Sequence, residues 1–283
     1  MSSNHILLIH GTWCNGDNWG SFADELKNRG YTVHTPTLRH HGAPSGDTWM
    51  NAQKVAKIGL LDYVADLIEL VDTMDSPPLI VGHSLGALLA QLVAERRPNA
   101  GVILLAPAPT SGIFALYPRS AFLWLRFLPQ WLMRKPMYPC SWKIWESMIC
   151  NTQSREIQES YYSTLCAESG TCYFQMVLWY LDPKKSARVN FDVITSPVLV
   201  VTGSEDKCAD PRIARTTARR YKHQSTYVEL KGSDHMLVFG RYMSETLEAI
   251  DLWLANNNIA PINGSKVFSG QPSQSPVPTS ITN

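Results

Sequence analysis

The sequence lacks an excess of charge of either sign, with 25 lysine and arginine residues against 24 aspartate and glutamate residues. A nearly neutral chain has no electrostatic basis for binding nucleic acid or strongly charged substrates. The sequence also lacks an uninterrupted apolar run, because prolines and arginines break up residues 113–133. This excludes a membrane-spanning helix in that stretch and leaves only a weak contact with a membrane surface open.

Cysteine is scarce, with six in 283 residues. None has the close spacing to histidine that is typical of zinc sites, so no metal and no cofactor is expected. An expected first strand at Ile6–Ile9 leaves no room for a signal peptide, which favours a cytoplasmic protein with free thiols. Four cysteines share one central stretch, where a local disulfide stays open: Cys140, Cys150, Cys166 and Cys172. Nothing in the sequence indicates the oligomeric state.

Short apolar runs alternate with helical patterns along most of the chain. This alternation is typical of parallel strands joined by crossover helices. Strands are expected at Ile6–Ile9, Tyr31–His34, Leu79–Val81, Gly101–Leu105, Val198–Val201 and Thr226–Leu230, and helices at Trp19–Arg29, Val55–Met74, Ala87–Ala94, Pro211–Tyr221 and Met243–Leu254. The sequence therefore predicts an α/β fold whose mostly parallel sheet has about six strands flanked by helices.

The alternation stops between about residues 107 and 190, where no convincing strand is found and tryptophan and tyrosine accumulate. We interpret 108–190 as a helical cap inserted into a core formed by 1–107 and 191–257. The polar remainder, 258–283, is predicted to be disordered. A segment inserted between parallel strands leaves the sheet at its carboxyl edge, so the cap is expected to cover a site there. Its inward-facing rings are expected to set the preference for acyl-chain length.

Residues 82–86 read Gly-His-Ser-Leu-Gly between an expected strand and an expected helix. Gly-x-Ser-x-Gly in this context predicts a nucleophile elbow, a turn so tight that side chains two positions from the serine would clash. The turn raises the Ser84 hydroxyl above the sheet edge, and the following helix directs its N-terminal amides at a developing oxyanion. We therefore expect Ser84 to attack a carbonyl carbon and His83 to pack and hydrogen-bond.

A serine nucleophile needs a base that a third group holds in place. Two carboxylates, Glu205 and Asp206, follow the strand Val198–Val201, and His235 follows the strand Thr226–Leu230. Both lie where parallel strands end, at the edge that carries the sites of such sheets.

These motifs resemble those of the α/β-hydrolase superfamily, in its small, capped esterase-like branch, up to about Ala255 except for the insertion. The resemblance rests on His10-Gly11 after the first strand, the Gly-x-x-Asp of 203–206 and Asp234-His235. It implies the α/β-hydrolase fold with a Ser84, Asp206, His235 triad in that chain order, and Asp206 rather than Glu205 as the acid. It further implies an oxyanion hole made by the backbone N–H groups of Thr12 and Leu85, with Trp13 walling the acyl site. The His-Gly-x-x-Cys…Trp pattern is also similar to the plant methylesterase and hydroxynitrile lyase group.

The expected function is hydrolysis of a small-molecule ester, either a lactone or an ester with a small to medium apolar acyl group, through an acyl-enzyme. A serine nucleophile argues against haloalkane dehalogenase and epoxide hydrolase chemistry, for which this branch carries aspartate. Two alternatives stay open. The same triad can serve acyl transfer, carbon–carbon bond cleavage or a lyase step, or the protein can be a hydrolase-like receptor with little turnover.

Overall fold

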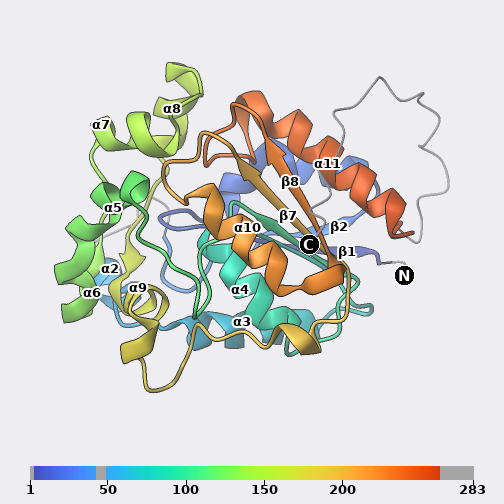
Figure 1. Cartoon of the computed structure of the whole chain (residues 1–283), viewed down its shortest axis with the longest axis horizontal. Helices are drawn as coiled ribbons and strands as arrows, with labels where there is room; N and C mark the ends of the chain where they lie inside the picture. The colour runs from blue at the N-terminus through green and yellow to red at the C-terminus, as the bar shows by residue number, and fades with distance from the viewer. Residues whose placement is uncertain (1–2, 43–48, 262–283) are drawn as a thin grey trace.

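One six-stranded parallel sheet forms the centre of the molecule. A computed structural model describes residues 3–42 and 49–261 and places the strands in the order β2-β1-β3-β4-β7-β8 (Figure 1). The strands are β1 (His5–Ile9), β2 (Thr32–His34), β3 (Leu79–His83), β4 (Gly101–Leu105), β7 (Val198–Gly203) and β8 (Ser225–Leu230). The predicted fold class is confirmed. Of the predicted disordered stretch 258–283, residues 262–283 lie outside the described residues. In the described part the prediction is wrong, because Ile259 is buried and its N–H donates to the Leu254 carbonyl oxygen at 3.0 Å.

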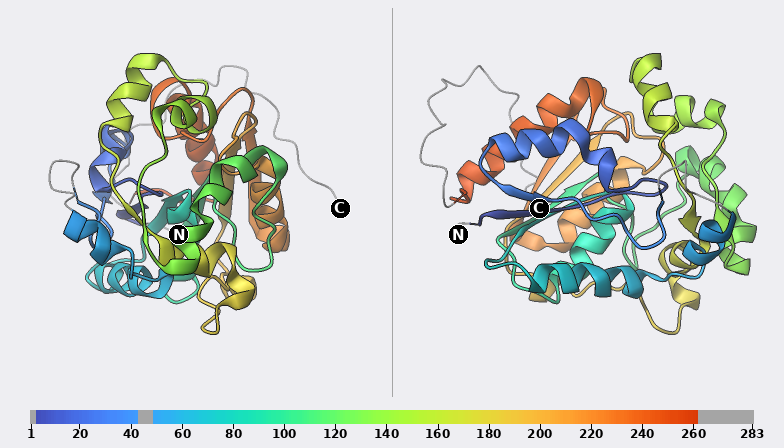
Figure 2. Two further views of the ribbon diagram at one scale, coloured as in Figure 1. Left: turned by 90° about the vertical axis from the view of Figure 1, so that its left-hand side faces the viewer. Right: turned by 180° about the vertical axis from the view of Figure 1, so that it is seen from behind.

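Helices cover both faces of this sheet. They are α1 (Gly20–Asn28) and α11 (Met243–Asn256) on one face, and α3 (Leu60–Asp72), α4 (Leu85–Ala94) and α10 (Pro211–Arg220) on the other (Figure 2). Side chains of a strand point alternately to the two faces. Accordingly Leu7 packs toward α3 and α4, whereas Leu8 packs toward α1 and α11. Burial on both faces explains why the central strands β1, β3, β4 and β7 read as nearly continuous apolar runs.

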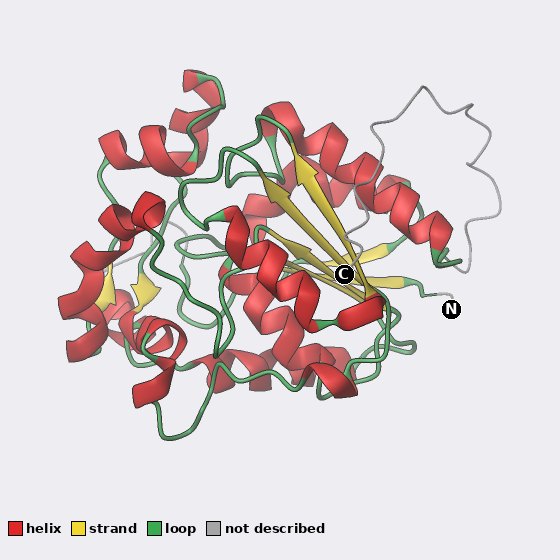
Figure 3. Cartoon of the chain, viewed as in Figure 1, coloured by secondary structure: helices red, strands yellow, loops and turns green. Residues whose placement is uncertain are grey.

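Most of residues 108–190 lie beyond the carboxyl ends of the strands, toward which the arrowheads of β7 and β8 point (Figure 3), and the end of this segment returns beside α4, where the Asn190 N–H donates to Glu95. Their helices are α5 (Pro118–Trp124), α6 (Leu128–Met133), α7 (Trp142–Ile144), α8 (Arg155–Tyr162) and α9 (Gly170–Val177), with short turns η3 (Leu125–Phe127), η4 (Trp145–Ile149) and η5 (Trp179–Leu181). Further short turns among the described residues are η1 (Gly16–Trp19), η6 (Phe191–Val193), η7 (Lys222–Gln224) and η8 (Gly240–Tyr242). Among the described residues, no helix is long and apolar enough to cross a membrane.

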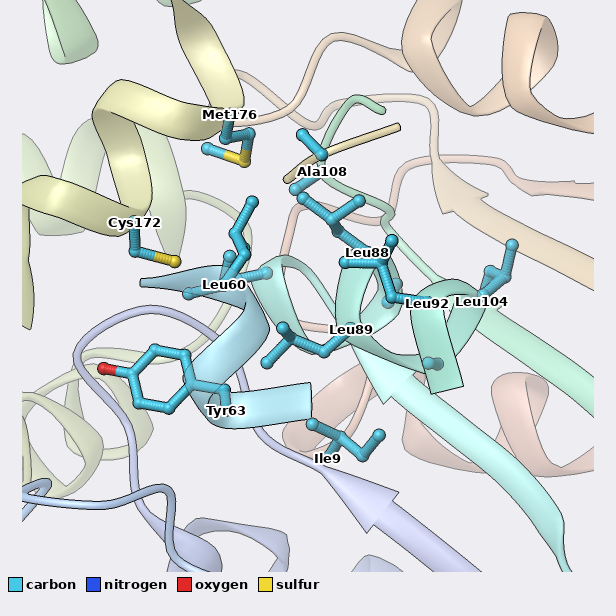
Figure 4. Close-up of a cluster of buried hydrophobic side chains, with 14 of the residues drawn as sticks. Ile9, Leu60, Tyr63, Leu88, Leu89, Leu92, Leu104, Ala108, Cys172 and Met176 are labelled. Carbon is cyan, nitrogen blue, oxygen red and sulfur yellow. The ribbon is translucent and has the colours of Figure 1, made fainter. Parts of the chain in front are cut away.

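The same hydrophobic core extends from the sheet into this segment. Leu88, Leu89 and Leu92 of α4 pack between the sheet and α3, and Cys172 and Met176 of α9 belong to the same cluster (Figure 4). Residues 108–190 are therefore packed onto the sheet domain through shared apolar contacts.

Two sequence predictions need correction. The expectation of no strand between 107 and 190 is wrong, since β5 (Pro136–Met137) and β6 (Glu168–Ser169) pair antiparallel. Strands of two residues are too short to show an alternating pattern.

The single helix expected over Val55–Met74 is also wrong, because the chain forms α2 (Trp49–Val55) and α3, separated before Gly59. The Leu60 N–H donates to Gln175 Oε1 of α9 at 2.8 Å, and the Gly59 N–H donates to the Asp62 carboxylate at 2.7 Å. The contact with Gln175 and the capping Asp62 carboxylate thus start a new helix at Leu60, although the apolar spacing of the sequence continues through this point.

Candidate active site

Ser84 occupies the turn between β3 and α4 with a backbone φ of 55°, a left-handed conformation that is rare for a residue with a side chain. The turn brings backbone into close contact on both sides. A Cβ on Gly82 would lie 2.2 Å from the carbonyl oxygen of Gly86, and one on Gly86 would lie 2.1 Å from that of Ile9. Only glycine fits either position. Leu85 begins α4, so its N–H is among the first-turn amides that have no partner within the helix.

His235 and Asp206 form a buried pair on the loops that follow β8 and β7. The His235 Nδ1 lies 2.7 Å from Asp206 Oδ2, and the other carboxylate oxygen accepts the backbone N–H groups of Cys208 and Ala209, each at 2.8 Å. Both side chains are almost completely buried. With Asp206 ionised, the pair fixes the imidazole proton on Nδ1 and leaves the lone pair on Nε2.

Charge on His235 is disfavoured by burial and favoured by Asp206. The attraction and hydrogen bond of the carboxylate, with a contribution from the Cys208 thiol, outweigh desolvation and raise the pKa of His235 well above its usual value. The Glu205 carboxylate instead lies at the surface, 2.8 Å from the Arg119 guanidinium. The structure therefore brings Asp206, and not Glu205, to His235.

Two further histidines support the loops around this pair. His83 Nε2 lies 2.9 Å from the backbone oxygen of His235, which fits the packing and hydrogen-bonding role predicted for it. Burial and the neighbouring His235 lower the pKa of His83 to about 3, so this imidazole is neutral and donates from Nε2. His10 accepts the Leu38 N–H through Nε2 at 3.0 Å and donates from Nδ1 to the Gly11 carbonyl oxygen, also at 3.0 Å.

The loop after β1 carries Thr12 and Trp13, and residues of 108–190 hold it. Trp13 has a φ of 64°, and only 2% of its surface is exposed. Its indole N–H donates to the Met137 carbonyl oxygen at 3.0 Å, and its own carbonyl accepts the Cys166 N–H at 2.7 Å. The Thr12 hydroxyl lies 2.6 Å from the hydroxyl of Tyr173 on α9. These three contacts, which we call the loop clamp, fix a backbone conformation that is otherwise unfavourable.

Two small cavities meet at Ser84. One, of about 20 Å³, also touches Thr12, Trp13 and His235 and is closed by Trp145 and Ile149. The other, of about 30 Å³, is mainly aliphatic and reaches Leu116, Met176 and Ile213. Ser84, Trp124 and Cys208 line both, so the last two side chains divide the space. Each cavity has room for only a few water molecules.

A wider hollow, of about 750 Å³, opens elsewhere, beside Arg97 and Ser196. Its lining contains no histidine and no cysteine. The candidate catalytic residues therefore line the two small cavities at Ser84 and not this wider hollow.

The structure thus brings together Ser84, His235, Thr12 and Trp13 in one cavity and pairs His235 with Asp206. Leu85, at the start of α4, directly follows Ser84. Sequence reasoning missed Trp124, Tyr173 and Cys208, for which no motif gives a signal beyond the general excess of aromatic residues. All six cysteines are free and buried, so no disulfide forms in the central stretch.

Comparison with known protein families shows to which family the chain belongs. The sequence profile described as the Alpha/beta hydrolase family matches residues 6–249. The chain belongs to this family. It is 28% identical over 123 residues to the pyrethroid hydrolase of Sphingobium wenxiniae, covering 41% of this chain and 42% of that protein. It is 30% identical over 113 residues to salicylic acid-binding protein 2 of Nicotiana tabacum, covering 38% and 41%.

A solved structure of this family extends the likeness to the whole fold. The extracellular alpha/beta-hydrolase from a Paenibacillus species superimposes with a TM-score of 0.67 at 20% identity, covering 88% of this chain and 98% of that one. Its description states structural and functional homology to the tobacco salicylic acid-binding protein 2. The matched stretches span only about two-fifths of the curated relatives. The similarities therefore show the α/β-hydrolase family and fold and leave the reaction and the substrate open.

Proposed function

We propose that this family member is a serine hydrolase of carboxylic esters that uses Ser84, His235 and Asp206 as a triad. The observation that carries the proposal is the 2.7 Å contact between His235 Nδ1 and Asp206 Oδ2 beside a cavity that His235 shares with Ser84. The strained conformation of Ser84 at the start of α4 adds support, because it presents the hydroxyl ahead of unpaired helix amides.

The reaction begins when Ser84 Oγ bonds to the ester carbonyl carbon and its proton passes to Nε2 of His235. The negative charge that moves to the carbonyl oxygen is stabilised by the N–H groups of Leu85 and Thr12. The tetrahedral species collapses by breaking the bond to the leaving oxygen, which takes the proton from Nε2. A water molecule then repeats the sequence on the acyl-enzyme, releasing the acid and the free serine.

We assign the alcohol part and the acyl part of the ester to different cavities, which Trp124 separates. The leaving oxygen must lie beside His235, which protonates it, so the alcohol occupies the cavity bounded by Trp13 and Trp145. The acyl chain then occupies the aliphatic cavity near Leu116 and Met176. Aromatic walls favour flat or bulky alcohols, and aliphatic walls favour apolar acyl chains. In this proposal aliphatic side chains therefore take the role in acyl-length preference that the sequence analysis gave to the aromatic rings of 108–190. Because both cavities are small, side chains of their lining must shift to admit a substrate.

The test is turnover of two ester series, p-nitrophenyl esters of increasing acyl length and acetate esters of increasingly bulky alcohols. Leu116→Ala should move the optimum acyl length upward and leave the alcohol profile unchanged. The matched variant Ile149→Ala should widen the alcohol profile and leave acyl length unchanged. If both variants shifted the same profile, the two assignments would be wrong, and absence of turnover on both series would contradict the hydrolase.

The alternatives differ from hydrolysis in their products. Acyl transfer gives a new ester, a lyase step gives a carbonyl compound without an acyl-enzyme, and a receptor binds its ligand with little turnover. The similarity to a salicylic acid-binding protein makes binding of a small aromatic acid a useful comparison in the same assay. The cytoplasmic location stays a prediction, since the Paenibacillus protein of the same fold is extracellular.

A further inference from the structure

The segment from Pro118 to Met133 consists of α5, η3 and α6. Apolar side chains lie on two opposite faces of this segment. Its inner side chains recur every three or four positions and are buried: Ser120, Leu123, Phe127 and Trp131. Four apolar side chains on the opposite side are exposed: Phe122 (68%), Leu125 (46%), Leu132 (54%) and Met133 (58%). A helical segment with an apolar outer face normally has a partner for that face. We call these four side chains, together with the basic side chains of Arg126 and Lys135, the outer face.

Charge near the outer face has one sign. Residues 113–145 contain five basic side chains and no aspartate or glutamate, in a chain whose total charge is nearly balanced. The Arg119 guanidinium is neutralised by Glu205 at 2.8 Å, and that of Arg134 lies over the Phe174 ring. Within residues 3–42 and 49–261, no ion pair is found for Arg126 or Lys135. Arg126 lies over the exposed ring of Phe122, with 5.0 Å to its centroid.

The exposed apolar side chains and the positive charge of the outer face together indicate which kind of partner it binds. Exposed Phe, Leu and Met side chains set among unpaired Arg and Lys are typical of helices that rest in the interface of a negatively charged membrane. A symmetric contact between two copies would bring Arg126 and Lys135 of both copies together without an acidic residue from this stretch to compensate. The charge therefore favours an anionic lipid surface over a second copy of the chain.

The outer face is also well placed on the molecule. α5 and α6 form the outermost layer at one end of the molecule (Figures 1 and 2), and Trp124 of α5 separates the two cavities at Ser84. We propose that the outer face of residues 118–135 docks on an anionic lipid surface, with Phe122 and Leu132 entering the interface and Arg126 and Lys135 contacting lipid phosphates. This docking does not depend on the catalytic roles proposed above.

The proposal is tested by co-sedimentation of the full chain with vesicles of phosphatidylcholine alone or of equal parts phosphatidylcholine and phosphatidylserine. We expect binding to the anionic vesicles only, weakened by salt. The double variant Arg126→Gln/Lys135→Gln should weaken it by about 30-fold, and Phe122→Ser/Leu132→Ser by a similar factor or more. The matched controls Lys184→Gln/Arg188→Gln and Leu252→Ser, whose side chains are exposed on other elements, should bind as the wild type does.

Three results would overturn the proposal. One is absence of binding to the anionic vesicles, and another is equal binding by Phe122→Ser/Leu132→Ser. The third is a self-association in analytical ultracentrifugation that the same variant abolishes, because the outer face would then be an interface between copies. Hydrolysis of a short, water-soluble ester should be unchanged in all four variants, so a failure of docking is distinguishable from a failure of the proposed chemistry.

Discussion

The loop clamp gives a sharp prediction, because it connects 108–190 to the backbone that is expected to hold the oxyanion. Tyr173→Phe removes the hydroxyl that lies 2.6 Å from Thr12 Oγ1, and its ring can still stack on Trp131, 6.0 Å away between centroids. Trp13→Phe keeps an aromatic ring against Trp124 and removes the N–H that binds the Met137 carbonyl. Tyr173→Phe leaves the half-buried Thr12 hydroxyl without this partner, and Trp13→Phe leaves the buried Met137 carbonyl without its donor.

The magnitude follows from the hydrogen bond that each substitution removes. An unpaired buried polar group costs about 1–3 kcal/mol of folding stability. Loss of one oxyanion donor lowers kcat by about 10²- to 10³-fold, and partial displacement of Thr12 should give about 10-fold or more. KM should change little in Tyr173→Phe, because the ground-state carbonyl gains less from the donor than the tetrahedral intermediate does. In Trp13→Phe, KM should also change, because Trp13 bounds the cavity assigned to the alcohol. The two variants act on one loop, so their effects on kcat should not add.

The assay compares kcat, KM and the affinity for a trifluoromethyl ketone, which forms a tetrahedral adduct. Tyr162→Phe is the matched control, because its hydroxyl donates to the Cys140 carbonyl at 2.8 Å, away from the clamped loop. Ketone affinity should fall with kcat in Tyr173→Phe and Trp13→Phe and stay at the wild-type value in Tyr162→Phe. If the two variants melted at a lower temperature but kept kcat and ketone affinity, the clamp would serve stability alone.

Three further outcomes are expected. Asp206→Asn should lower kcat by about 10³- to 10⁴-fold, whereas Glu205→Gln should stay within a few-fold in the same ester assay; the reverse order would reassign the acid. Because the base must be neutral and the pKa of His235 is raised, kcat/KM should increase with pH along a limb centred above pH 6.5, and a limb centred below that value would contradict the assigned cause. Gly86→Ala should destabilise the fold by about 3 kcal/mol or more in urea unfolding, since its Cβ would meet the Ile9 carbonyl at 2.1 Å; an unchanged midpoint would show that the elbow has room.

The residues that sequence reasoning found share a local origin. The elbow is predictable because a Cβ on Gly82 would clash with Gly86 inside the same five-residue turn, although Gly86 itself is restricted by the Ile9 carbonyl of β1. Asp206 and His235 follow the ends of β7 and β8 by three and five positions. The sheet was predictable for the same reason, since its four central strands are buried on both faces and read as apolar runs bounded by turn signals.

The residues that were missed depend on contacts between distant segments. Thr12 and Tyr173 are 161 positions apart, and Trp13 and Met137 are 124 apart. The break before α3 likewise requires Gln175, and the strands β5 and β6 exist only because they pair with each other. The sequence predicts aromatic accumulation in 108–190, but only packing determines that Trp124 divides the site and Tyr173 holds the Thr12 loop.

The most direct test of the central claim is covalent labelling by a fluorophosphonate, followed by mass mapping of the modified peptide. The triad predicts a single adduct on Ser84 that forms more slowly in His235→Ala and is absent from a folded Ser84→Ala variant. Labelling that persisted in Ser84→Ala, or an adduct mapped to another residue, would contradict Ser84 as the nucleophile.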